Sequence, residues 1–334
     1  MKNQKHDERL IYELWQNAAF DEGTYRLVDQ IVKDLSSKER SRRLPIQEIY
    51  FELATIRNRN LISRNEQLKL RKTVVAFFGL SVGSHSALTW MMLSRADEIK
   101  IIDPDDISPT NLNRLRFGWD SVGKKKIDVV GKALLKINPF VKIFKSNNTS
   151  SKSLIQTLSS LPKVDVVVDA IDKIEDKLLL RKTCKEKKIP LLSAADVGDN
   201  IFLDIERYDL YPQPIYFLGR IPNIEKVDFS KLTELGRKRL LIRLVGLDFN
   251  SERMLKSLYA IGDTVNTWPQ LGSTATIAGG LITTAIKKIL IGEALKSGRY
   301  KIDLDGLLMS DSVKKRKRKS QLIKKVKKKF KMDW

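Results

Sequence analysis

The fold is decided by Thr73-Val74-Val75-Ala76-Phe77-Phe78-Gly79-Leu80-Ser81-Val82-Gly83-Ser84. Residues 74–78 have the length and composition of a buried strand, and an apolar helical pattern follows over 87–93. A glycine turn between them lets backbone N–H groups approach a phosphate without interference from Cβ atoms. Only Gly79 and Gly83 remain of a Gly-x-Gly-x-x-Gly fingerprint, so the segment alone also fits a strand-to-helix turn without a ligand.

A second strand is predicted over 99–102, and it ends at Asp103, roughly 20 residues beyond the glycines. A doubly wound α/β fold places at this point the carboxylate that holds a ribose hydroxyl. Asn111, Arg114 and Lys126 follow. A nicotinamide enzyme does not need these three polar groups, whereas an enzyme that splits a triphosphate does, because charge builds up on the phosphates. The segment therefore favours a nucleotide-triphosphate site.

Composition narrows the class of protein. The 334 residues are 42% hydrophobic, which suffices for a full core. The single cysteine, Cys184, excludes a disulfide framework and a multi-cysteine zinc site formed by this chain alone. Cys184 lies inside a predicted helix and before the next strand, so we expect a buried, inert thiol. The first residues lack the apolar core of a signal peptide, so we expect a cytoplasmic protein.

A later buried strand, over 164–169, is followed by Asp172. Open α/β sheets bind ligands beyond the carboxyl ends of their strands. Mg²⁺ typically takes one or two carboxylates and completes its coordination with water and phosphate oxygens. Asp172 is therefore well placed for magnesium, and the alternative is an ordinary turn residue. His85 begins the first predicted helix, where we expect it to meet solvent or a phosphate.

Several motifs of this region keep a near-constant spacing, namely Asp103-x-Asp105, Ser108-x-x-Asn111-Leu112-Asn113-Arg114, the Gly123/Lys126 pair and Ile137-Asn138-Pro139. In this order they resemble the ThiF/MoeB family of ubiquitin-activating-enzyme-like adenylyltransferases. The resemblance covers about residues 57 to 298. The form of the glycine turn, together with Asp204-Ile205-Glu206-Arg207-Tyr208-Asp209, resembles a bacterial ThiF-like branch.

The resemblance implies a Rossmann-like, doubly wound, mainly parallel sheet with helices on both faces, and ATP and Mg²⁺ as cofactors. It implies a homodimer, because in the family an arginine crosses to the phosphates of the other subunit; Arg59 is the candidate and Arg57 the competitor. Relatives have asparagine where Lys173 stands. The implied nucleotide-binding residues are Gly79, Ser81, Gly83, Asp103, Asp105, Asn111, Arg114 and Lys126. The implied catalytic residues are Arg59, Arg114, Lys126 and Asp172, with Asp172 as the metal ligand.

Three regions are expected: a helical N-terminal extension over 1–55, the adenylation domain over 56–300, and a basic tail over 301–334. The formal net charge is +22, and residues 314–331 hold twelve Lys and Arg and no acid. Within this tail, Leu322, Val326, Phe330 and Trp334 recur at four-residue spacing, as in a basic amphipathic helix. Such a tail suits an anionic membrane, nucleic acid or an acidic protein, or it only increases solubility.

The function expected from this combination is ATP-dependent activation of a carboxylate as an acyl-adenylate, with release of pyrophosphate. The carboxylate would be the C-terminus of a ubiquitin-like or sulfur-carrier protein, a peptide, or a small acid. Two alternatives stay open. One is a non-catalytic binding or scaffold protein on the same fold. The other is a nicotinamide-dependent oxidoreductase, which leaves Asn111, Arg114, Lys126 and Asp172 without a role.

Overall fold

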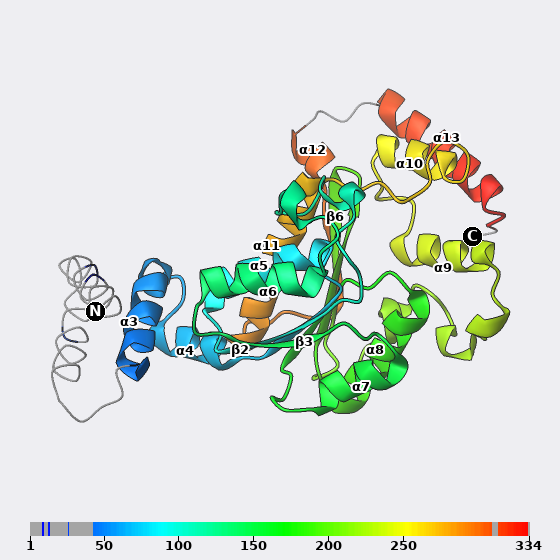
Figure 1. Ribbon diagram of the computed structural model, residues 1–334. Helices are drawn as coiled ribbons and strands as arrows, with labels where there is room; N and C mark the ends of the chain where they lie inside the picture. Colours follow the sequence, from blue (N-terminus) through cyan, green and yellow to red (C-terminus); the bar gives the residue numbers. More distant parts are fainter. Residues whose placement is uncertain (1–8, 10–12, 14–25, 27–42, 309–312, 333–334) are drawn as a thin grey trace.

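A seven-stranded sheet forms the centre of the protein (Figure 1). The computed structural model describes residues 9, 13, 26, 43–308 and 313–332. The strand order is β3-β2-β1-β4-β5-β6-β7, parallel from β3 to β5 and antiparallel from β5 to β7. The predicted mainly parallel, doubly wound sheet is confirmed. The strands are β1 Val75–Phe78, β2 Glu98–Ile102, β3 Lys142–Ser146, β4 Val166–Asp169, β5 Leu191–Val197, β6 Asn200–Glu206 and β7 Gly298–Ile302.

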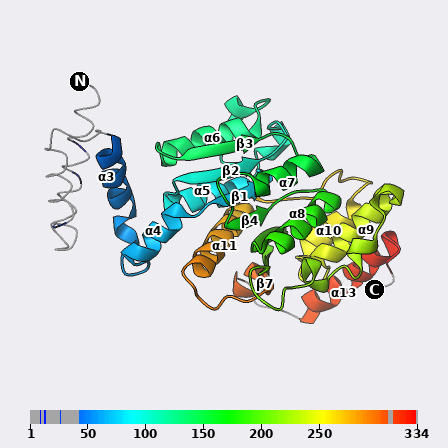
Figure 2. The ribbon, with the colours of Figure 1, turned by 90° about the horizontal axis from the view of Figure 1, so that it is seen from below.

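Helices cover both faces of the sheet, as predicted. Figure 2 shows α5, α6 and α11 on one side of the strands and α7 and α8 on the other. Two separate apolar clusters fill the spaces between these layers. The described helices are α3 Arg43–Thr55, α4 Arg64–Lys72, α5 Val82–Ser94, α6 Lys126–Ile137, α7 Ser151–Ser159, α8 Ile174–Lys187, α9 Glu234–Val245, α10 Glu252–Ala260, α11 Gly272–Leu290, α12 Leu304–Leu308 and α13 Val313–Lys329.

The alternation of side chains along β1 explains why this strand is central. Val75 and Phe77 point into the cluster beneath α5 and α11, whereas Ala76 and Phe78 point into the cluster beneath α7 and α8. All four are fully buried, as expected for a parallel strand covered on both faces. The chain winds from β1 through β2 to β3 on one side and then returns to β4 on the other. The carboxyl ends of β1 and β4 therefore flank the point at which ligands bind in such sheets.

Helices α5 and α11 pack against each other at a glycine. A Cβ atom added at Gly279 would lie 2.8 Å from the backbone carbon of His85. The neighbouring Gly280 points into open space, with no atom within 4 Å of its added Cβ. The two adjacent glycines of one helix therefore have opposite steric surroundings.

Replacing Gly279 by alanine is expected to lower the free energy of unfolding by about 1–3 kcal/mol, because the helices must separate to admit the methyl group. Replacing Gly280 by alanine is expected to raise it by about 0.5–1 kcal/mol, because alanine is the better helix former. Urea unfolding of both variants beside the wild type measures the difference. A Gly279→Ala variant as stable as Gly280→Ala would contradict the close packing.

The two ends of the described chain lie on opposite sides of the sheet. Figure 1 shows α3 at one end and α9, α10 and α13 at the other. The helices expected over the first 42 residues lie outside the described residues, except for three isolated positions, and so does Trp334. The segment expected to form an amphipathic tail helix contains α13, and Val326 of this helix and Phe330 just beyond its end are buried against α10. Strand β7 crosses residue 300, where the tail was expected to begin.

None of the described helices combines the length and apolar character needed to cross a membrane.

Candidate active site

The glycine turn joins β1 to α5 and is held against the carboxyl end of β4. Gly79 has φ +89°, and a Cβ atom there would lie 2.2 Å from the carbonyl oxygen of Ala170, so only glycine fits. A Cβ atom at Gly83 would lie 3.2 Å from the Cβ of Ala170, which is tight but tolerable. The two glycines therefore bring the turn next to the loop that carries Asp172.

Asp103 links the end of β2 to this turn. One oxygen of its buried carboxylate accepts a hydrogen bond from the backbone N–H of Leu80, at 2.6 Å, and the other accepts one from the N–H of Asp105, at 2.9 Å. Burial raises the pKa of Asp103, and the ammonium of Lys126 together with the two N–H groups opposes this rise. The structure thus brings together the predicted ribose-binding acid and the predicted glycine turn.

Lys126 begins α6 and lies between two acids. Its Nζ is 2.8 Å from Oδ2 of Asp105 and 3.7 Å from Oδ1 of Asp103. The lysine side chain is 7% exposed, whereas that of Asp105 is 59% exposed. A cation held in this way at the edge of the glycine turn can contact a phosphate if Asp105 turns outward to solvent. Lys126, Asp103 and Asp105 form one connected group.

Arg114 reaches the glycine turn from the segment after β2. Its Nε donates to Oγ of Ser81 at 3.1 Å, and its Nη1 donates to the carbonyl oxygen of Thr110 at 3.0 Å. Burial lowers the pKa of Arg114, while the negative charges of Asp196 and Asp172 raise it. Arg114 therefore lies within electrostatic reach of the predicted metal ligand. Arg114 and Ser81 thus meet at the glycine turn.

Asp172 fits the requirements of a magnesium ligand that shares its ion with a nucleotide. It is exposed, and it follows β4 at the carboxyl edge of the sheet. Within the described part of the chain, no three His, Cys, Asp or Glu side chains gather in a way that could hold a metal ion. One carboxylate with water and phosphate oxygens is a usual coordination for Mg²⁺, so the residues present fit the ion. Lys173 is also exposed and precedes α8.

Two predicted residues are placed differently from the rest. Asn111 uses its side-chain oxygen to accept a hydrogen bond from the N–H of Ser108, which closes a short 3₁₀ turn. Arg59 lies near Glu52, 3.9 Å away, and its neighbour Asn58 donates to the carbonyl oxygen of Leu93, near the C-terminal end of α5. The glycine turn is at the other end of α5, roughly 18 Å away. Within one chain, Arg59 therefore does not join the other predicted site residues.

Asp196 is a residue of this region that the sequence interpretation missed. It lies near the end of β5, is 3% exposed, and accepts a hydrogen bond from Nε2 of Gln270 at 3.2 Å. Its Oδ2 has no hydrogen-bond partner among the described residues. Burial raises the pKa of Asp196, and Gln270 and Arg114 oppose the rise. Its position at the carboxyl end of a parallel strand is the signal that could have identified it.

The roles considered for His85 and Cys184 have different outcomes. The expectation that His85 meets solvent is wrong: the residue is 2% exposed, and its ring lies between the carbonyl oxygen of Arg114 and the hydroxyl of Thr276, while the alternative of a phosphate contact stays a prediction. It joins the Arg114 segment to α11. The prediction of an inert thiol is supported, because Cys184 is fully buried in α8 and burial raises its pKa well above the usual range.

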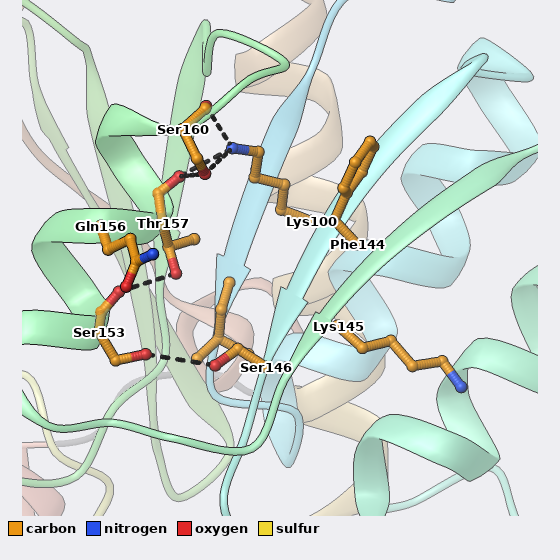
Figure 3. Close-up of a pocket in the computed structure, with 9 residues that line it drawn as sticks. Lys100, Phe144, Lys145, Ser146, Ser153, Gln156, Thr157 and Ser160 are labelled. Atoms are coloured by element: carbon orange, nitrogen blue, oxygen red, sulfur yellow. Dashed lines mark hydrogen bonds between the residues drawn. The ribbon is translucent and has the colours of Figure 1, made fainter.

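A polar pocket of about 260 Å³ lies on the α7 side of the edge formed by β2 and β3. Figure 3 shows Lys100 extending across it, where its Nζ donates to the carbonyl oxygens of Thr157 and Ser160, each at 2.8 Å. The hydroxyls of Ser146 and Ser153, which also line the pocket, share a hydrogen bond of 3.3 Å. The pocket adjoins the predicted ribose site, because the N–H of Asp103 donates to the carbonyl oxygen of Ser146 at 3.1 Å.

Several known proteins are similar to this chain in sequence. An uncharacterized protein, MT1398, of Mycobacterium tuberculosis is 28% identical over 253 residues, which cover 75% of this chain and 35% of that protein. Ubiquitin-like modifier-activating enzyme 5 of Culex quinquefasciatus is 28% identical over 149 residues, covering 41% of this chain and 36% of that enzyme. This chain therefore spans about a third of the length of these two relatives.

The fold is also found among solved structures. Escherichia coli MccB, crystallised with MccA-N7isoAsn, superposes with a TM-score of 0.53 at 20% identity, covering 80% of this chain and 77% of that one. This likeness extends to the arrangement of the sheet and its helices. The model of the ThiF family matches residues 55–324, which is most of the chain. The protein belongs to the ThiF family.

Proposed function

We propose that this protein is an ATP-dependent adenylyltransferase that activates a carboxylate as an acyl-adenylate and releases pyrophosphate. The observation that carries the proposal is the convergence of Asp103, Lys126 and Arg114 on the glycine turn, with Asp172 within electrostatic reach of Arg114. In a complex with a nucleoside triphosphate, Asp103 would suit the ribose, Lys126 and Arg114 the phosphates, and Asp172 the magnesium ion. Membership in the ThiF family, and the name of the Culex relative, support the same reaction.

The order of the strands supports one orientation of the bound nucleotide. Asp103 at the end of β2 would hold the ribose, and the pocket beside Ser146 offers hydroxyl and amide groups to the base. The triphosphate would then run along the glycine turn toward β4. Lys126 and Arg114 would neutralise the charge that grows on the phosphates, because both are cations already held at this turn. Magnesium would supply further charge neutralisation at Asp172.

The reaction requires no covalent bond to the enzyme. A carboxylate oxygen of the substrate attacks the α-phosphorus, the bond from that phosphorus to the β-phosphate oxygen breaks, and pyrophosphate leaves with the electron pair. The products are the acyl-adenylate and pyrophosphate. Cys184 takes no part, because its thiol is buried in α8. The substrate is a small acid, a peptide or the C-terminus of a ubiquitin-like protein, and the acceptor of the acyl group is an external nucleophile.

ATP–pyrophosphate exchange tests the proposal directly. Wild-type protein is incubated with ATP, Mg²⁺ and labelled pyrophosphate, with and without candidate acids, peptides and ubiquitin-like proteins. Label is expected to enter ATP only when a suitable carboxylate is present, because the reverse reaction needs the acyl-adenylate. If no candidate supports exchange and calorimetry detects no binding of ATP, the protein is a non-catalytic member of the fold.

Mixing two inactive variants tests whether Arg59 acts across a homodimer. We expect Arg59→Ala and Asp172→Asn each to lose activity, and an unfolded and refolded equal mixture to regain about a quarter of the wild-type activity. Half of the randomly formed dimers contain both variants, and one of their two sites then combines an intact Asp172 with the partner's intact arginine. An inactive mixture of correctly refolded dimers would exclude action in trans. Arg57→Ala serves as the control and is expected to retain activity.

A further inference from the structure

The outward side of α13 forms a cationic surface, which we call the α13 surface. It consists of Arg318, Lys324, Lys325 and Lys328 of the helix and of Lys331 just beyond its end, all of which are exposed. The remaining exposed side chains of the described part of this helix are Ser320 and Gln321. Residues 314–331 contain no acid at all. The α13 surface therefore presents positive charge and hydrogen-bond donors but no apolar anchor.

The apolar side of α13 is occupied within the protein itself. Val326 is fully buried and Phe330 is 4% exposed, in a cluster with Met254, Leu255 and Leu258 of α10. This cluster is the reason that the cations of α13 have a fixed direction. They do not lie on an unattached tail.

Polar contacts at the end of the helix strengthen this attachment. The Nζ of Lys329 is 2.7 Å from a carboxylate oxygen of Asp263, and Nε of Arg239 donates to the carbonyl oxygen of Phe330 at 2.6 Å. Lys329 is the only cation among the described side chains of α13 that has an ion pair. Among the described residues, the cations of the α13 surface therefore have no ion-pair partner.

The repulsion between these neighbouring charges destabilises the helix. Lys324 and Lys328 are four residues apart on one face, and like charges at this spacing destabilise a helix by about 0.2–0.5 kcal/mol. Both lie on the opposite side from Val326, because two residues correspond to roughly 200° of helical rotation. A polyanion bound along this face would relieve the repulsion and release its own condensed counterions. The charge pattern thus complements a regularly charged backbone.

We propose that the α13 surface binds the phosphodiester backbone of a nucleic acid without reading its base sequence. A membrane is disfavoured, because the apolar side chains that would insert between lipids are buried against α10. A specific protein partner is disfavoured, because the described exposed residues of α13 include no aromatic or aliphatic side chain to fill a pocket. Binding of this kind is driven by counterion release and falls steeply with salt.

The experiment compares two triple variants of the full chain. In the first, Lys324, Lys325 and Lys328 are each changed to glutamate. In the second, the exposed Lys132, Lys152 and Lys163, which lie on α6, on α7 and before β4, are changed in the same way. The change in net charge is identical. Fluorescence anisotropy with labelled RNA and DNA of about 20 nucleotides, single-stranded and duplex, is measured over a series of salt concentrations, and circular dichroism checks the fold.

Wild-type protein is expected to bind all these probes, and its logarithmic affinity should fall linearly with the logarithm of salt concentration. The α13 variant should bind at least about tenfold more weakly, with a duplex-DNA salt slope smaller in magnitude by about 3, since each lost phosphate contact removes about 0.9. The second variant should change little. A Lys→Gln version of the first variant should also reduce the slope, and it guards against misfolding caused by the glutamates.

Three outcomes would overturn the proposal. Equal weakening by both variants would attribute binding to net charge and not to α13. Wild-type binding to vesicles of anionic lipid, at equal charge concentration and tighter than to any nucleic acid, would assign the surface to membranes. Absence of binding to every nucleic acid at low salt would leave α13 as a solubilising element. None of these results depends on adenylation, so the test is independent of the proposed function.

Discussion

Replacing Asp172 by asparagine is expected to lower the rate of ATP–pyrophosphate exchange by about 10²–10³-fold, the effect of removing one group that stabilises transition-state charge. The substitution keeps the size of the side chain and removes only the negative charge. Because Asp172 is exposed, the free energy of unfolding should not change. Exchange rates at saturating substrate and urea unfolding of the same preparation measure the two quantities.

The dependence of the exchange rate on Mg²⁺ concentration provides a second measurement of the role of Asp172. If Asp172 holds Mg²⁺, the variant should need a higher Mg²⁺ concentration for half-maximal exchange, while its requirement for the carboxylate substrate stays close to that of the wild type. Asp120→Asn provides the control, since Asp120 is an exposed acid outside the candidate site. Full exchange activity in Asp172→Asn, at an unchanged Mg²⁺ requirement, would remove Asp172 from the mechanism.

Replacing Arg181 by methionine is expected to have the largest effect on stability. Arg181 is 1% exposed and pairs with Asp169 at 2.6 Å and with Glu206 at 2.7 Å. Hydrogen bonds from the hydroxyl of Tyr208 and the N–H of Phe217 to Glu206 complete this buried group. Removing the cation leaves the buried Glu206 without its ion-pair partner and leaves Asp169 with Lys177 alone, 3.2 Å away, which costs about 3–5 kcal/mol.

The pH dependence separates this cause from simple loss of packing. In the variant, burial without Arg181 holds the pKa of Glu206 above its unfolded value, so protonated Glu206 favours the fold. The variant should therefore be least unstable at low pH and lose stability as pH rises through the folded pKa of Glu206. Urea unfolding from pH 5 to pH 8, with the exposed Lys256→Met as control, measures this. A stability loss of equal size at every pH would indicate packing alone.

Much of the fold could be predicted because its signals are local. The strand over 74–78, the glycine turn and the acid at the end of the next strand each follow from neighbouring residues, and parallel pairing then brings their ends together. Asp103, Lys126, Ser81 and Arg114, which the family resemblance named together, lie around one turn in the structure, and their binding roles stay a prediction. Spacing along the chain was informative there because the segments between these residues are short.

The remaining features depend on contacts between distant segments. Asp196 meets Gln270 across 74 positions of sequence, and although Asp196 follows a predicted strand, nothing near it shows that Gln270 would be its partner. His85 is buried because Gly279, far along the chain, allows α11 to approach it closely. The apolar stripe of α13 was visible in the sequence, but nothing nearby showed that α10 would cover it. In each case the sequence alone did not show which distant segments would pack against each other.

The two edge strands of the sheet carry exposed lysines. Strand β3 forms one border and presents Lys142, and strand β7 forms the other and presents Lys301. Unpaired strands invite another chain to extend the sheet, and outward cations oppose this because two such borders repel each other. A pair of subunits is therefore expected to meet through helices and loops, and not through one continuous sheet. Replacing Lys142 and Lys301 by valine would remove this repulsion between edge strands and promote self-association at high protein concentration.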